Sequence, residues 1–181
     1  MLEFEPKHIS MYILTVKDNY IHKSELPNET YIEEEYLKAS EFLKSQGYNH
    51  YEVSNFSLSG QECLHNMKYW SSDSVAAIGP SATGYLVKNA ENAIRYKWKN
   101  KLLKYDLEIL DQEQVSLERE YLSFRTSRGL NILSNETRAL AKNWADRSLG
   151  HFLNDKFHLN SKGFLVLDSL MNEYFSAISR T

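Results

Sequence analysis

A strand, a long helix and a second strand follow one another near the start of the chain, and this order restricts the fold most. Residues 8–16, HISMYILTV, form a nearly continuous apolar run, which is typical of a strand buried on both faces. Thr30 and Glu33 have the spacing of a capping box, and Gly47 stands where a helix should stop, so the sequence predicts a helix between them. Residues 48–56, YNHYEVSNF, predict the second strand. A crossover of this kind places the two strands parallel in one sheet.

Two parallel strands of the buried type need further strands beside them. The sequence therefore indicates that β-α units preceding residue 1 belong to the same fold. Further along, residues 84–88 and 94–99 predict a hairpin, and residues 101–110, KLLKYDLEIL, predict the first of several helices. The segment 156–170, KFHLNSKGFLVLDSL, has a polar turn before a long helix, as in winged-helix-like domains.

Composition excludes several classes of protein. The net charge is -3, so a nucleic acid or an acidic membrane would need a local basic patch. One cysteine can form no internal disulfide and cannot supply the several thiolates of a usual zinc or iron-sulfur site. The apolar runs are shorter than the ~20 residues of a membrane span, and MLEFEPKHIS lacks the order of a signal peptide. We expect a soluble, cytoplasmic protein.

Residues 62–72, ECLHNMKYWSS, gather the side chains with the most chemistry. If this segment is helical, His65 and Tyr69 share one face, and Asn66 and Trp70 share the adjacent face. The imidazole would then stand beside two aromatic rings, where it could ligate a haem iron or hydrogen-bond a carboxylate. The alternative is that His65 bonds within a seam of the protein and that the two aromatic residues are core.

Three other motifs carry weaker signals. Cys63 and His65 are two neighbouring metal donors without further ligands at suitable spacing. IGPSATG, residues 78–84, lacks both the Lys-Ser/Thr ending of a phosphate loop and the G-x-G-x-x-G spacing, so a tight turn is the simpler interpretation. RYKWKNKLLK, residues 95–104, would place cations on one strand face and Tyr96 and Trp98 on the other. The cations would either bind phosphates or carboxylates of a ligand, or form a solvated face while the two aromatic residues pack in the core.

The order of these segments resembles a known family. HISMYILT, GYNHYEVSNF, ECLHNMKYW, AAIGPSATGYL, LSFRTSRGLN and LNSKGFLVLDSL follow one another as in the C-terminal half of the radical-SAM, oxygen-independent coproporphyrinogen III oxidase-like proteins, and within them the HemW-type haem chaperones. H-N-x-x-Y-W beside Y-E-x-S-N-F is the most specific part. The C-x-x-x-C-x-x-C motif that holds a [4Fe-4S] cluster in the N-terminal half of other members is not in this chain.

The resemblance implies a fold and a domain division. The fold class would be α/β plus mostly α: the last part of a partial (β/α) radical-SAM barrel, followed by a helical, winged-helix-like domain. Residues 1–104 would hold the last β-α-β unit, the H-N-x-x-Y-W segment and the hairpin, and residues 105–181 the helical domain. Without the cluster motif, this chain alone would catalyse no radical reaction.

The resemblance also implies ligands. His65 would be the axial ligand of a haem iron, with Asn66, Tyr69 and Trp70 around it, and Leu14 and Thr15 would border S-adenosylmethionine at the strand ends. Thr83 stands where the family's G-P-S-A-H-S turn has a histidine, so a role that rests on that histidine does not transfer. The true oxidases lack H-N-x-x-Y-W, which favours the chaperone branch.

The expected function is binding of haem for delivery to acceptor haem proteins. The first alternative is part of a coproporphyrinogen III oxidase, which decarboxylates porphyrinogen propionates oxidatively in haem biosynthesis. The second is a protein or nucleic-acid interaction module, whose basic residues would include Lys97, Lys99 and Lys101. An exposed strand edge along residues 9–16 also predicts pairing with a second copy of the chain or cover by a loop.

Overall fold

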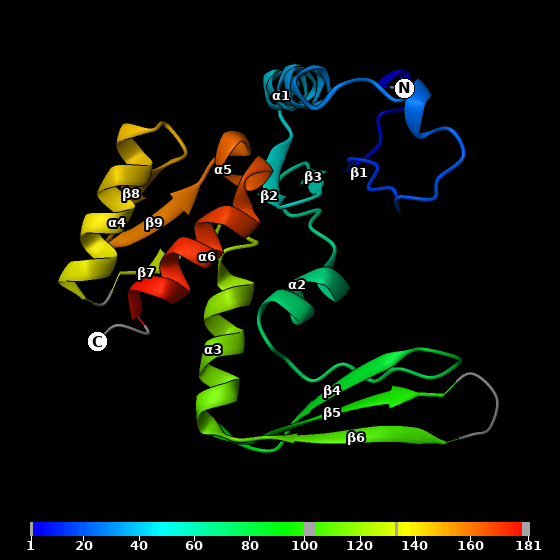
Figure 1. Ribbon diagram of the computed structural model, residues 1–181, viewed down its shortest axis with the longest axis vertical. Helices are drawn as coiled ribbons and strands as arrows, with labels where there is room; N and C mark the ends of the chain where they lie inside the picture. Colours follow the sequence, from blue (N-terminus) through cyan, green and yellow to red (C-terminus); the bar gives the residue numbers. More distant parts are fainter. Residues whose placement is uncertain (1, 100–103, 133, 179–181) are drawn as a thin grey trace. The chain divides into compact units, whose positions relative to one another are not determined.

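The computed structural model describes residues 2–99, 104–132 and 134–178. The chain divides into two compact units (Figure 1), one made of Met1–Glu62 with Asn131–Thr181 and the other of Cys63–Leu130. The described residues form small three-stranded sheets and helices, an α/β composition. These two units differ from the two domains expected over residues 1–104 and 105–181, and that domain division stays a prediction. No helix among the described residues is long and apolar enough to cross a membrane.

The first sheet contains β1 (His8–Ser10), β2 (Asn49–Glu52) and β3 (Asn55–Ser57) in the order β1-β3-β2. The single strand expected over residues 48–56 is wrong, because the chain reverses at residues 53 and 54 and β3 pairs antiparallel with both neighbours. β1 and β2 do run in the same direction in one sheet, but β3 lies between them.

Buried polar contacts hold this reversal. Glu52 is fully buried and accepts a hydrogen bond from the Asn55 side-chain amide, and the hydroxyl of Ser10 donates to Asn55 from the neighbouring strand. β1 is also shorter than residues 8–16, since the strand ends at Ser10. It lies at one edge of the sheet, and the expected pairing with a second copy stays a prediction.

The long helix α1 (Glu29–Ser45) is confirmed, but its cap differs from the expected one. Asn28, not Thr30, is the N-cap, and its side chain accepts a hydrogen bond from the Tyr31 N–H. At the other end Gly47 has a φ of 86°, as expected for the residue that stops the helix. The N–H of Gly47 donates to Lys44 and the N–H of Tyr48 to Leu43, which is the hydrogen-bond pattern of a Schellman motif.

Two short 3-10 helices, η1 (Leu2–Phe4) and η2 (Lys23–Glu25), also belong to this unit. Its C-terminal part begins at Asn131, the second residue of β7 (Leu130–Asn131), and contains α4 (Asn135–Asp146), β8 (Gly150–Leu153), β9 (Lys156–Leu159), α5 (Ser161–Leu165) and α6 (Leu167–Ile178). Their sheet has the order β7-β9-β8. Trp144, Phe157 and Leu170 are almost completely buried among these elements. The partial barrel and the winged-helix relationship stay predictions.

The second unit contains α2 (Leu64–Trp70), the sheet β4 (Thr83–Val87), β5 (Ala93–Trp98) and β6 (Tyr105–Leu110), and α3 (Gln112–Ser123). The hairpin of β4 and β5 is confirmed. The helix expected over residues 101–110 is wrong where it is described, because Tyr105–Leu110 is a strand paired antiparallel with β5. Residues 101–103 of that prediction lie outside the described residues.

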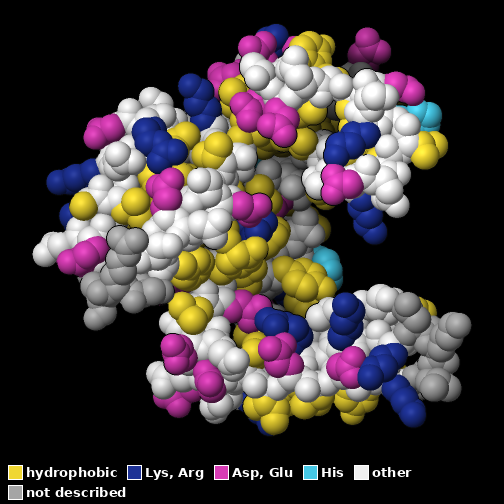
Figure 2. All heavy atoms as spheres, in the orientation of Figure 1, with side chains coloured by type: hydrophobic (Ala, Val, Ile, Leu, Met, Phe, Trp, Pro, Cys, Tyr) yellow, Lys and Arg dark blue, Asp and Glu magenta, His cyan; other side chains and the backbone are white. Residues whose placement is uncertain are grey.

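Strand β6 alternates apolar and acidic side chains, and this alternation fits the ladder that it forms. Asp106 lies 2.6 Å from Lys99 Nζ, and Glu108 lies 2.8 Å from Arg95 Nη1. The opposite face carries Tyr105, Leu107 and Ile109, all exposed. Figure 2 shows hydrophobic side chains along this sheet, at the bottom of the view. A period of two fits a strand, and β5 supplies the partner that this strand needs.

Candidate functional site

Residues His65 to Trp70 are helical, within α2. The rings of His65 and Tyr69 meet at a centroid distance of 5.0 Å with an interplanar angle of 84°, as the i, i+4 spacing predicts. His65 is exposed and Tyr69 is 39% exposed, so the imidazole stands at the surface beside one aromatic edge. The imidazole is therefore accessible to a ligand from solvent and is not a core side chain.

The indole ring of Trp70 lies beside the guanidinium of Arg125, a neighbour that the sequence analysis did not predict. The guanidinium carbon of Arg125 lies 6.0 Å from the centre of its indole ring, within the range of a cation–π contact. The Nε1 atom of Trp70 is buried and has no hydrogen-bond acceptor among the described residues. Asn66, on the same side of the helix, is half-buried.

Cys63 is the N-cap residue of α2, although its side chain makes no capping hydrogen bond. In the described part of the chain, no group of three or more His, Cys, Asp or Glu side chains could hold a metal ion. A lone imidazole that ligates an iron already held by a porphyrin fits this donor set, whereas a metal site made only of protein ligands does not.

Helix α3 packs beside α2 (Figure 1), and two arginines of the segment that follows α3 contact α2 and its C-cap. Arg125 and Arg128 come from LSFRTSRGLN, a motif that only the resemblance had singled out. Arg128 donates a 2.7 Å hydrogen bond to the hydroxyl of Ser71, the C-cap residue of α2. Sequence reasoning missed both arginines because they lie more than 50 positions from the helix that they contact.

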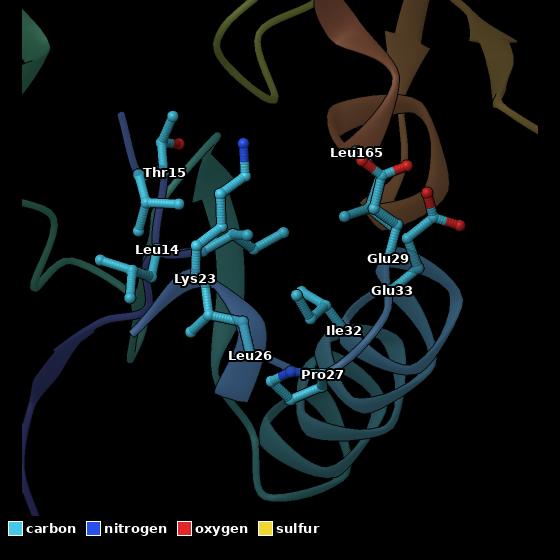
Figure 3. A pocket seen from close by; sticks show the side chains of 11 residues that line it. Leu14, Thr15, Lys23, Leu26, Pro27, Glu29, Ile32, Glu33 and Leu165 are labelled. Carbon is cyan, nitrogen blue, oxygen red and sulfur yellow. The ribbon is translucent and has the colours of Figure 1, made fainter. Parts of the chain in front are cut away.

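Leu14 and Thr15 lie in the other unit and line a cavity of about 530 Å³ (Figure 3). Apolar side chains of Ile13, Val16, Leu26, Pro27, Ile32 and Leu165 form much of its wall. Lys23 lies on one side, and Glu29 and Glu33 at the start of α1 lie on the other. The sequence alone gave no signal for these charged residues, because the cavity is formed by a loop, a helix and α5.

Two cations of the basic segment 95–104 are paired with carboxylates. Arg95 is paired with Glu108 and with Glu118, and Lys99 is paired with Asp106. Tyr96 and Trp98, on the other face as expected, bond through their polar atoms to the backbone of Ala77. This pairing weakens the reading of the segment as a phosphate-binding surface. Lys101 lies outside the described residues.

Comparison with known proteins gives related sequences. The heme chaperone HemW of Buchnera aphidicola from Schizaphis graminum is 37% identical over 97 residues, which cover 52% of this chain and 26% of that protein. The heme chaperone HemW of Lactococcus lactis is 26% identical over an alignment of 200 positions, which covers 96% of this chain and 52% of that protein. By sequence the chain is HemW-like.

The radical S-adenosyl methionine domain-containing protein 1, mitochondrial, of Danio rerio is a further relative of this HemW-like chain. It is 29% identical over 107 residues, which cover 55% of the chain and 24% of that protein. The chain spans about half, or less, of the length of each of these three relatives. No protein-family model matches the chain, and no solved structure matches it.

Proposed function

We propose that this HemW-like chain binds haem through His65 and belongs to a protein that delivers haem to acceptor haem proteins. The observation that carries the proposal is the exposed imidazole of His65 on α2, held against the edge of Tyr69. The names of the relatives support it, since those of Buchnera and Lactococcus are heme chaperones. A ligand that must be passed on needs an accessible site, and an exposed helix turn provides one.

The residues of α2 have separate parts in this proposal. A nitrogen of the His65 imidazole would be the axial ligand of the iron, and the ring contact with Tyr69 limits the orientations of the imidazole. The buried Nε1 of Trp70 is a donor without an acceptor among the described residues, and a buried unsatisfied donor costs about 1–3 kcal/mol. A bound water or ligand could satisfy this donor.

A haem titration followed by absorbance tests the proposal. We expect a Soret shift with the unaltered chain and at least about a ten-fold weaker affinity with His65→Ala, because an iron–imidazole bond is lost. The matched control is His151→Ala, which removes another exposed imidazole, one that is stacked on His158 in the other unit. An equal affinity of the unaltered chain and His65→Ala, or an equal loss in both variants, would remove His65 as the ligand.

We further propose that Leu14 and Thr15 border S-adenosylmethionine in the intact protein. The cavity that they line has a volume in the usual range for small-molecule sites, with apolar walls for a purine and carboxylates that suit a cationic ligand. Within the radical-SAM resemblance, this ligand supplies a radical when an iron-sulfur cluster reduces it. One cysteine cannot supply the three thiolates of that cluster, so the residues of this chain do not fit the cluster itself.

Equilibrium dialysis with labelled S-adenosylmethionine tests the second site. We expect Leu14→Arg to weaken binding at least about ten-fold, because a long cationic side chain would fill the cavity and repel a cationic ligand. Ile21→Arg is the control, since Ile21 is exposed in the same connection and does not line the cavity. Equal binding by the unaltered chain and Leu14→Arg, or no binding by either, would contradict this assignment.

A further inference from the structure

The strand β6 lies at the edge of its sheet, as Figure 1 shows for the order β4-β5-β6. Its six residues pair with β5 in one continuous register without a bulge. Among the described residues, no strand pairs with the other side of β6. Every second residue of an edge strand points its N–H and C=O groups away from the sheet, so β6 offers backbone groups that a further strand could bind.

The opposite edge of the sheet is bridged by the chain itself. Val75 and Tyr85 of β4 exchange two backbone hydrogen bonds, of 2.7 and 2.9 Å, in an isolated antiparallel bridge. Two residues further on, the backbone of Ala77 hydrogen-bonds to the side chains of Tyr96 and Trp98 on β5. The two edges therefore differ, and β6 is the edge that can accept a partner.

The two faces of β6 differ in chemistry. Tyr105, Leu107 and Ile109 form an apolar row in which each residue is more than half exposed. Asp106 and Glu108 form an acidic row on the other face, and their side chains are also more than half exposed. The cations paired with this acidic row lie on the β5 side of it, so the outer edge of β6 presents negative charge. A strand added there would place its side chains alternately beside the two rows.

We propose that β6 receives an extended segment of a partner protein in which apolar and basic side chains alternate. The apolar side chains of this segment lie beside the apolar row, and its basic side chains lie beside the acidic row. Its backbone supplies the hydrogen bonds of a fourth strand, which is recognition by β-strand addition. The inference does not depend on haem binding by His65.

The acidic row disfavours a second copy of the chain as the partner. If two β6 strands pair antiparallel around Leu107, Asp106 of one copy faces Glu108 of the second copy. If they pair around Glu108, that carboxylate faces its own equivalent. Like charges directly opposite one another destabilise an antiparallel pair, and charged residues on edge strands limit self-association in this way. A basic segment meets the same carboxylates with attraction.

Fluorescence anisotropy of labelled synthetic peptides on the full chain tests the proposal. We expect saturable binding of a peptide that repeats Val-Lys three times. The Val-Glu peptide of the same length should bind at least about ten-fold more weakly, because its carboxylates would face the acidic row. Of two Val-Lys peptides, one N-methylated at the valines and one at the lysines, one should bind about ten-fold more weakly than the other, since only one set of N–H groups faces β6.

A double variant tests the acidic row. Asp106→Asn with Glu108→Gln should bind the Val-Lys peptide about ten-fold more weakly, because both carboxylates are removed. The matched control is Glu91→Gln with Glu113→Gln, which removes two exposed carboxylates of the same unit outside β6. Far-UV circular dichroism verifies the fold. The peptide comparison needs no variant, so it decides the question if the double variant does not fold.

Hydrogen exchange measured by mass spectrometry locates the peptide. We expect slower exchange in residues 105–110 when the Val-Lys peptide binds, because the outward amides gain acceptors. No binding of that peptide, equal binding of the Val-Glu peptide, equal binding of the two methylated peptides, an equal loss in the control variant, or protection only outside residues 105–110 would each overturn the inference. A dimer of the free chain with these amides already protected would overturn it as well, in favour of a second copy at this edge.

Discussion

Replacing Trp144 by alanine is expected to lower the free energy of unfolding by about 3–5 kcal/mol, the range for a large aromatic residue removed from a core. Trp144 is 0% exposed, and its ring lies 5.7 Å from that of Phe157 between centroids. Its indole N–H also donates a 2.7 Å hydrogen bond to Glu173. The substitution removes the ring and this donor together. Urea unfolding followed by circular dichroism of the backbone measures the change without relying on tryptophan fluorescence.

Two further variants separate the contributions at this position. Trp144→Phe keeps a ring against Phe157 but loses the N–H, so its cost should be smaller, about 1–3 kcal/mol. Tyr31→Ala removes an exposed aromatic residue of α1 and should change stability by less than about 0.5 kcal/mol. A loss below about 1 kcal/mol in Trp144→Ala would contradict the packing described for α4 and β9.

The second large effect is expected from acid, through His50. This side chain stacks on Phe56 at 4.0 Å between ring centroids, meets Phe164 edge to face, and has its Nδ1 atom 3.1 Å from the hydroxyl of Ser161. Burial lowers the pKa of His50 from 6.5 to about 4, with the charge of Lys44 on α1 acting in the same direction. The histidine therefore joins β2 to α5 as a neutral ring.

The sign of the pH effect follows from that shift. Below pH 6.5 the unfolded chain takes up a proton that the folded chain refuses, so the free energy of unfolding falls as the pH drops toward 4. The contribution of His50 is fully present above pH 6.5, and its complete loss below pH 4 amounts to about 3 kcal/mol. Urea unfolding at intervals between pH 7 and pH 4 measures this dependence.

His50→Phe isolates the histidine from carboxylates that titrate in the same range. Phenylalanine keeps a ring for the stacking contacts and cannot take up a proton, so the variant should lose less stability between pH 6.5 and pH 4.5 than the unaltered chain. If the free energy of unfolding fell equally with pH in the two proteins, the lowered pKa of His50 would be contradicted. Tyr36, whose hydroxyl lies 3.4 Å from His50 Nε2, does not titrate in this range, and burial raises its pKa further, to about 12.

Local patterns predicted the elements that depend on local interactions. Gly47 predicted the end of α1, and residues 84–88 and 94–99 predicted the β4 and β5 hairpin. The spacing of His65 and Tyr69 predicted their contact. The N-cap of α1 was predicted two residues too late. Asn28 and Thr30 are both residue types that favour an N-cap, and the sequence does not show at which of them the helix begins.

Tertiary contacts decided the rest. The reversal in residues 49–57 depends on Ser10 and a buried Glu52, and β6 is a strand because β5 supplies its hydrogen-bond partners. A six-residue segment with apolar residues at alternate positions can pack in either conformation until such a partner is present. The sequence could not show which conformation would be selected.

At the candidate site, too, some contacts were predictable from the sequence and others depended on tertiary structure. By itself the sequence determined that His65 and Tyr69 share one face if the segment is helical, because the helical repeat fixes neighbours four residues apart. The structure supplied the helix. Only the tertiary structure brought Arg125 to Trp70 and Arg128 to Ser71, since contacts between positions more than 50 residues apart depend on how α2 and α3 pack. The ring contact of His65 could therefore be predicted from the sequence, whereas the contacts of the two arginines with α2 could be found only in the tertiary structure.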